Sequence, residues 1–265
     1  MGLGEAERRG PADDAYARRA MVVGLAFLAT AVATLFAQAT LVRSTRDHRP
    51  QDRVWTIALA FVALASAALA TGASTGWDNG TFRVFYLLGA VLAVPWLALG
   101  TVYLLARPAT ARRVERMLIF LSGLATGVLL AAPMHNVHGT AIPVGHDVFD
   151  AFPRVLAGVG NGLGATVIIA GALVSAWHFG RHRATPGNGR RAAANLLIAT
   201  GTLVLSSGGL VQGVAGKDEA FVISLAVGLS VIYAGFLVAA SATRPDRATL
   251  AAASVESDAS REFAP

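Results

Sequence analysis

The sequence predicts an all-α membrane protein, a seven-transmembrane helical bundle with its N-terminus outside and its C-terminus in the cytoplasm. Seven apolar stretches of about 17 to 25 residues contain no Asp, Glu, Lys or Arg, and a helix needs roughly 20 such residues to cross a ~30 Å hydrocarbon core. Hydrophobic residues make up 54% of the chain and charged residues 14%, a larger apolar share than soluble domains have. The runs are continuous rather than alternating, which favours helices over a β-barrel.

Charged residues delimit the predicted spans in order. The first span follows a polar tail and stops at Arg43, the second begins after Arg53, and the third contains Pro95, which predicts a break in the helix. The links are too short for a soluble domain. The spans are 21–42, 54–73, 84–106, 117–133, 155–179, 192–214 and 220–242, between an N-terminal tail, 1–20, and a cytoplasmic tail, 243–265, whose polar composition predicts disorder.

The orientation follows from the distribution of basic residues, because Lys and Arg near span ends stay on the cytoplasmic side. The first, third and fifth links each carry four arginines and the C-terminal tail carries three, whereas the second, fourth and sixth links carry one basic residue each. The N-terminal tail opposes this pattern with four arginines, but four acidic residues balance them. We therefore expect a multi-pass protein of the cell membrane with a cytoplasmic C-terminus.

The net charge of +6 predicts anionic lipid headgroups as partners rather than nucleic acid. The arginines flank membrane spans, where they attract acidic headgroups, and no nucleic-acid recognition motif accompanies them. The absence of cysteine excludes disulfides, thiolate chemistry and cysteine metal sites. A protein partner or a homo-oligomer stays open.

Small residues recur at helical spacing in the last three spans. Helices in lipid associate through such residues because their backbones can approach closely, so we expect these three helices to pack tightly. The abundance of Gly and Ala makes chance stripes the alternative. A formal G-x-G-x-x-A match at Gly160 lies inside an apolar run, which excludes a dinucleotide site. The stripes are Ala157, Gly164 and Gly171; Ala194, Gly201, Gly208 and Ala215; and Gly228, Gly235 and Ala242.

The spans contain polar groups but no carboxylates, which disfavours a proton pump because pumps keep ionisable groups at depth. Amide and phenol groups can instead hydrogen-bond a ligand or one another. Arg83 and Arg154 at the outer span ends can bind an anion, or neutralise Asp78 and Asp150 at the headgroup level. The candidate ligand-binding residues are Gln38, Tyr86, Asn161, Asn195, Gln212, Tyr233, Arg83 and Arg154.

The fourth link collects candidate metal ligands on the predicted outer face, namely His135, His138, His146 and Asp147. Imidazole and carboxylate groups bind Zn²⁺ or Cu²⁺. The spacing is not that of a known metal motif, and the alternative is a solvated loop in which Asp150 stabilises the start of the fifth helix.

Two resemblances follow from particular segments. Residues 83–99, RVFYLLGAVLAVPWLAL, superficially resemble the third helix of microbial rhodopsins, but retinal needs a lysine in the middle of the seventh helix, and Lys217 precedes that helix. Retinal is therefore not expected, and the cofactor is unknown. The same segment with GTVYLLARP, and VIYAGFLVA in the seventh span, resembles uncharacterised seven-helix multi-pass proteins of high-GC, actinobacterial-type bacteria, a resemblance that implies no activity.

Three functional classes remain from the sequence. The favoured one is a non-enzymatic membrane protein that binds a small or lipidic ligand, or a partner subunit, in a helical bundle. The second is a transporter or channel for a neutral or lipophilic solute, with Pro95 and the glycine-rich helices as moving parts. The third is a membrane enzyme or sensor that uses a metal at the outer histidines.

Overall fold

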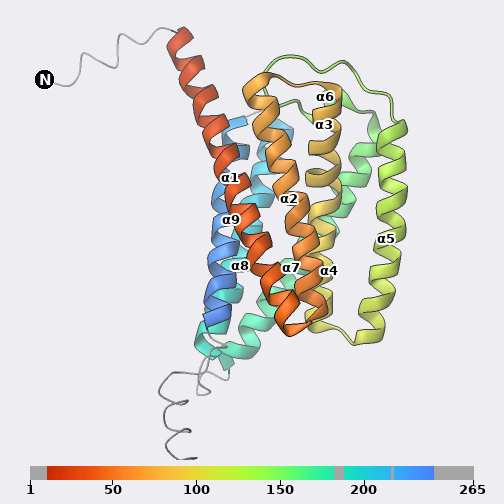
Figure 1. Ribbon diagram of the computed structural model, residues 1–265, viewed down its shortest axis with the longest axis vertical. Helices are drawn as coiled ribbons and strands as arrows, with labels where there is room; N and C mark the ends of the chain where they lie inside the picture. Colours follow the sequence, from red (N-terminus) through yellow and green to blue (C-terminus); the bar gives the residue numbers. More distant parts are fainter. Residues whose placement is uncertain (1–10, 182–187, 216–217, 242–265) are drawn as a thin grey trace, which may run out of the picture.

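The computed structural model describes residues 11–181, 188–215 and 218–241, and these form helices and no strand (Figure 1). Seven of the helical stretches are long and apolar enough to cross a membrane. The predicted all-α class and the number of spans are therefore confirmed. The predicted C-terminal tail, 243–265, lies outside the described residues.

Each predicted span overlaps one long helical stretch, and most helices extend into the links. The third span consists of three consecutive segments, and the short α6 lies in the link after α5. Pro50 and Pro108 stand at the first positions of α2 and α5, where the missing N–H removes no hydrogen bond. The helices are α1 Pro11–Asp47, α2 Pro50–Thr75, α3 Asn79–Phe85, η2 Tyr86–Ala93, α4 Val94–Leu105, α5 Pro108–Ala131, α6 Gly145–Val148, α7 Ala151–Arg181, α8 Asn188–Ala215 and α9 Asp218–Ser241.

Six of the seven spans form a closed ring. Around it α1 packs on α2, α2 on α4, α4 on α7, α7 on α8, α8 on α9, and α9 returns to α1. The fourth span, α5, lies outside the ring at one edge of the bundle (Figure 1), where the Trp96 indole N–H donates to the Ser122 hydroxyl at 3.0 Å.

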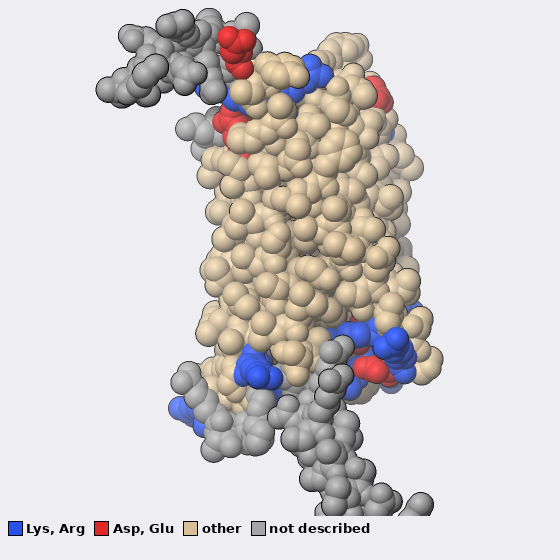
Figure 2. Space-filling model, turned by 60° about the vertical axis from the view of Figure 1, so that its left-hand side comes forward, with Lys and Arg blue, Asp and Glu red and all other residues tan. Residues whose placement is uncertain are grey.

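The bundle surface suits a bilayer. In the face shown in Figure 2, Lys, Arg, Asp and Glu gather toward the two ends and leave an uncharged belt between them. We call the end with the α1–α2 turn, 44–53, and the α4–α5 turn, 106–112, the arginine-rich end. The opposite end carries the link 132–150.

Close packing of α8 on α9 confirms the glycine prediction for these two helices. A methyl group at Gly201 would lie 2.7 Å from the Gly228 carbonyl oxygen, and one at Gly228 would lie 2.8 Å from the Gly201 carbonyl oxygen. A methyl group at Gly235 would meet the Ala194 carbonyl oxygen at 2.8 Å. Because backbone atoms cannot swing aside, these glycines are what lets the two backbones touch.

The stripe on α7 faces a different neighbour from the one predicted. A methyl group at Gly164 would lie 3.0 Å from Val94, and one at Gly171 would lie 2.5 Å from Thr101. Both neighbours belong to α4. The expected packing of the last three helices holds, since α7 packs on α8 and α8 on α9, but the α7 stripe itself contacts the third span, which the ring places directly beside α7.

The third span changes its hydrogen-bond register before Pro95. In the π-helix η2 each carbonyl pairs with the N–H five residues on, so the Ala90 carbonyl would pair with residue 95, which is a proline and has no N–H. The Asn161 side-chain amide of α7 fills this gap and donates to the Ala90 oxygen at 2.8 Å. The break predicted from Pro95 is therefore a π segment supported by α7.

Candidate functional site

A cavity of about 320 Å³ lies at the arginine-rich end, between the α1–α2 turn and the region where α4 meets α5. We call it the rim pocket. Segments about 60 residues apart in the chain therefore share one site. The lining residues are Ser44, His48, Arg49, Pro50, Arg53, Tyr103, Arg112 and Glu115.

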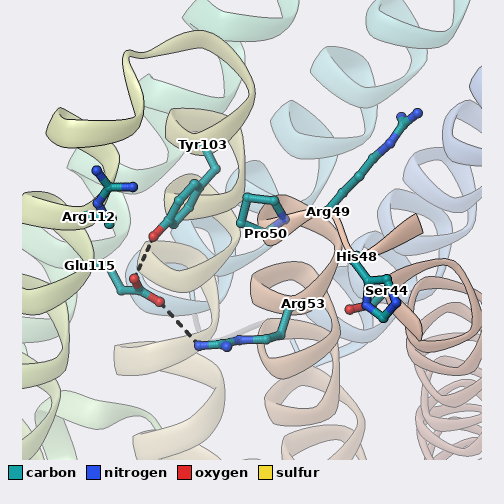
Figure 3. A pocket seen from close by; sticks show the side chains of 8 residues that line it. All are labelled: Ser44, His48, Arg49, Pro50, Arg53, Tyr103, Arg112 and Glu115. Carbon is teal, nitrogen blue, oxygen red and sulfur yellow. Dashed lines mark hydrogen bonds and ion pairs between the residues drawn. The ribbon is translucent and has the colours of Figure 1, made fainter. Parts of the chain in front are cut away.

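One wall of the rim pocket is a chain of three polar side chains. The Tyr103 hydroxyl of α4 donates to a Glu115 carboxylate oxygen of α5, and the other oxygen lies 3.7 Å from the Arg53 guanidinium of α2. Figure 3 shows these groups in a row. Glu115 thus joins three spans and directs Arg53 along the pocket.

The remaining basic groups set the charge of the rim pocket. Arg49 pairs with Asp47 at 3.8 Å and points away from the Tyr103–Glu115 row (Figure 3). Arg112 is exposed and lies on the other side of Glu115. The lining holds three arginines and one carboxylate, and Asp47 beside it balances Arg49, so the pocket keeps a small excess of positive charge, as an anion site requires.

The α1–α2 turn, which carries five of the eight lining residues, is tightly defined. His48 adopts a left-handed conformation with φ 50°, and its N–H donates to the Ser44 carbonyl at 3.1 Å. This arrangement caps the C-terminus of α1, and glycine is the residue most often found at such a left-handed capping position. A non-glycine residue in this conformation persists only where its surroundings hold it.

An ion pair between a buried carboxylate and a partly exposed guanidinium lies beside this turn, and sequence reasoning missed it. The Asp52 side chain in the first turn of α2 is 0% exposed, and its Oδ2 lies 3.6 Å from the Arg43 Nε of α1. Neither carboxylate oxygen accepts a hydrogen bond from the described part of the chain. Its position three residues into a helix that starts at Pro50 was the available signal, because acidic residues favour a first helical turn.

At the opposite end, the link 132–150 is a packed cover rather than a solvated loop. Its apolar side chains enter the main core, where Phe149 stacks on Phe82 and Tyr86. Hydrogen bonds fix the backbone of the link at several points. The Trp77 backbone N–H donates to the Gly139 carbonyl at 2.7 Å, and the Ile142 backbone N–H donates to an Asp218 carboxylate oxygen at 2.9 Å.

The predicted metal ligands lie on the outside of this cover. His135, His138, His146 and Asp147 are exposed, and His146 Nε2 lies 3.3 Å from an Asp147 oxygen. Within residues 11–181, 188–215 and 218–241, no three His, Asp or Glu side chains gather as a metal site would require. The metal hypothesis stays a prediction.

Arg83 has a structural partner. Its guanidinium donates to the carbonyls of Leu129 and Leu130 and, at 2.9 Å, to that of Ala132, so it caps the C-terminus of α5. Arg154 is exposed at the start of α7. Asp78 caps α3 instead, and hydrogen bonds from the Thr81 hydroxyl and from backbone N–H groups hold the pKa of the Asp78 carboxyl below its usual range.

The polar residues predicted to form a ligand site within the spans lie in separate places. Tyr86 belongs to the aromatic cluster under the cover, Tyr233 packs on Phe36 with ring centroids 5.0 Å apart, and Asn195 donates to a carbonyl of its own helix. Gln38 is exposed on α1, whereas Gln212 is buried on α8.

Comparisons with protein-family models, curated proteins and solved structures find no match to this chain.

Proposed function

We propose that this chain is a non-enzymatic protein of the cell membrane that binds an anionic, phosphate-bearing lipid headgroup in the rim pocket. The arginine-rich end faces the cytoplasm in this proposal, in line with the distribution of basic residues. The observation that carries it is a cavity of about 320 Å³ whose lining joins three arginines from the ends of two helix pairs.

The chemistry of the lining supports a phosphate group. Guanidinium groups bind phosphate through paired N–H donors, and the Ser44 hydroxyl and His48 imidazole add donors at the same mouth. The pocket lies among the helix ends of the arginine-rich end, and charged residues gather at the ends of the bundle (Figure 2), the depth at which lipid headgroups sit. The lipid chains would extend along the exposed apolar faces of the helices.

The test of this function is lipid binding by Arg112→Ala. We expect about fivefold weaker binding of phosphatidylglycerol, since an arginine near an anionic surface contributes about 1 kcal/mol. The measurement is native mass spectrometry of the protein released from nanodiscs of phosphatidylcholine with increasing phosphatidylglycerol.

The matched control is Arg113→Ala. Arg113 is the next residue of α5, is exposed, and does not line the rim pocket, so its removal changes the net charge equally. A specific site predicts nearly unchanged binding for this variant. Equal losses for Arg112→Ala and Arg113→Ala would show unspecific attraction and contradict the proposal.

The broken third span favours a second candidate function, transport of a neutral or lipophilic solute. A π segment followed by a proline can absorb a change of helix direction, and Asn161 carries a buried side-chain oxygen without a hydrogen-bond donor in the described residues. The glycines of α7 let it pack closely against the break: a methyl group at Gly160 would lie 3.5 Å from Pro95, and one at Gly164 would lie 3.0 Å from Val94.

Lipid scrambling in proteoliposomes tests this candidate. Fluorescent NBD-phosphatidylcholine should equilibrate between leaflets faster than in empty liposomes, and Asn161→Leu should slow the exchange because it removes the hydrogen bond to the Ala90 carbonyl. Thr166→Leu on the exposed face of α7 serves as the control. A rate equal to that of empty liposomes would eliminate this candidate.

A further inference from the structure

We infer that the ion pair between Arg43 and the buried Asp52 is a positioning device that sets the shape of the rim pocket. This inference rests on the proposed headgroup site, since it names what holds one wall of that site in place. Neither residue lines the pocket.

The first step is the covalent connection between the pair and the pocket. Arg43 directly precedes the α1–α2 turn and Asp52 is its second-last residue. The lining residues Ser44, His48, Arg49 and Pro50 lie between them, and Arg53 follows Asp52. Fixing the two ends of so short a segment restricts its backbone, and with it the positions from which these side chains extend.

The second step is the burial of the Asp52 carboxylate. Asp52 is 0% exposed and receives no hydrogen bond from the described residues, so Arg43 at 3.6 Å provides the compensating contact for its charge. A buried carboxylate with one such partner holds that partner firmly, because separation leaves its charge uncompensated in an apolar surrounding.

The third step connects the pair to the rest of the bundle. The Arg43 guanidinium lies over the Phe236 ring of α9, 4.9 Å from its centroid. One helical turn away, the buried Thr40 hydroxyl accepts from the Thr56 hydroxyl at 3.1 Å, which joins α1 to α2 a second time. The turn is therefore anchored to α9 as well as to its own two helices.

The decisive variant is Asp52→Asn. If the ion pair positions the turn, this variant should weaken headgroup binding, whereas a purely electrostatic effect should strengthen it. Removing a negative charge near an anion site should strengthen headgroup binding by Coulomb attraction. Loss of the pair instead lets the turn shift, and we expect phosphatidylglycerol to bind about tenfold more weakly, the equivalent of one lost charge-assisted hydrogen bond.

Asp47→Asn is the matched control. Asp47 lies in the same turn and is 45% exposed, so this variant removes the same charge without touching the Arg43–Asp52 pair. We expect its affinity to stay unchanged or to rise. The double variant Arg43→Gln with Asp52→Asn should recover part of the lost affinity, because it leaves no buried charge unpaired.

The experiment uses the full chain in nanodiscs of phosphatidylcholine and phosphatidylglycerol, with hydrogen–deuterium exchange of residues 44–53 as a readout that needs no ligand. Weaker binding and faster exchange in Asp52→Asn, with both near normal in Asp47→Asn, support the inference. Unchanged or tighter binding by Asp52→Asn, with weaker binding by Arg112→Ala, would overturn it and leave the headgroup site intact. If Arg112→Ala also binds normally, the proposed function fails, and the inference about the pocket fails with it.

Discussion

Arg43→Gln should lower the free energy of unfolding by about 1 to 3 kcal/mol, less than for a fully buried ion pair because the Arg43 side chain is 27% exposed. Asp52 would then keep a carboxylate that is 0% exposed, without a cation within ion-pair distance in the described residues. The contact of the guanidinium with Phe236 would be lost as well. The measurement is unfolding in mixed micelles with increasing sodium dodecyl sulfate, followed by circular dichroism.

Arg46→Gln provides the comparison for this prediction. Arg46 lies one turn further along α1 and is exposed, so its loss should cost well under 1 kcal/mol. Adding Asp52→Asn to Arg43→Gln should restore part of the stability. Equal effects of Arg43→Gln and Arg46→Gln would mean that the pair is no more stabilising than a surface contact.

Gly201→Ala is expected to destabilise the bundle by about 1 to 3 kcal/mol through overpacking. The added methyl group would lie 2.7 Å from the Gly228 carbonyl oxygen and 3.0 Å from the Ile232 backbone nitrogen. Neither backbone atom can rotate away, so α8 and α9 must separate. A thermal unfolding midpoint in detergent, measured by circular dichroism, reports the loss.

Gly209→Ala controls for the change of residue type in the same helix. A methyl group at Gly209 would meet no atom within 4 Å, and alanine favours a helix over glycine by about 1 kcal/mol. The unfolding midpoint should stay constant or rise. A similar decrease for both variants would show that α8 tolerates no alanine for reasons other than its contact with α9.

Hydropathy predicts the seven spans well because transfer of each apolar residue into lipid is favourable whatever its neighbours. The ends of the helices are set by other forces. For example, α1 includes residues 11–20 of the predicted tail, because charged residues continue a helix as easily as apolar ones. The π segment 86–93 was not predictable from Pro95 alone, since it depends on Asn161 of a distant span.

The sequence predicted at which end of the bundle the candidate site lies, but not which residues form it. The arginine count predicts headgroup contacts at the arginine-rich end, and the rim pocket lies there. The carboxylates Asp52 and Glu115 received no role from sequence because their partners come from other helices, and hydropathy carries no information on which links adjoin. Arg83 was predicted as an anion ligand for the same reason, since its carbonyl partners at the end of α5 lie 46 to 49 residues away.

Two of the arginines at the opposite end bind the ends of helices that follow them in the chain. Arg19 of α1 donates to the Ala73 and Ser74 carbonyls at the end of α2, and Arg83 does the same for α5. Because synthesis proceeds from the N-terminus, each guanidinium leaves the ribosome before the carbonyls that it will bind. The first and second spans, and likewise the third and fourth, are thus each joined by an arginine of the earlier span that binds the C-terminal end of the later one.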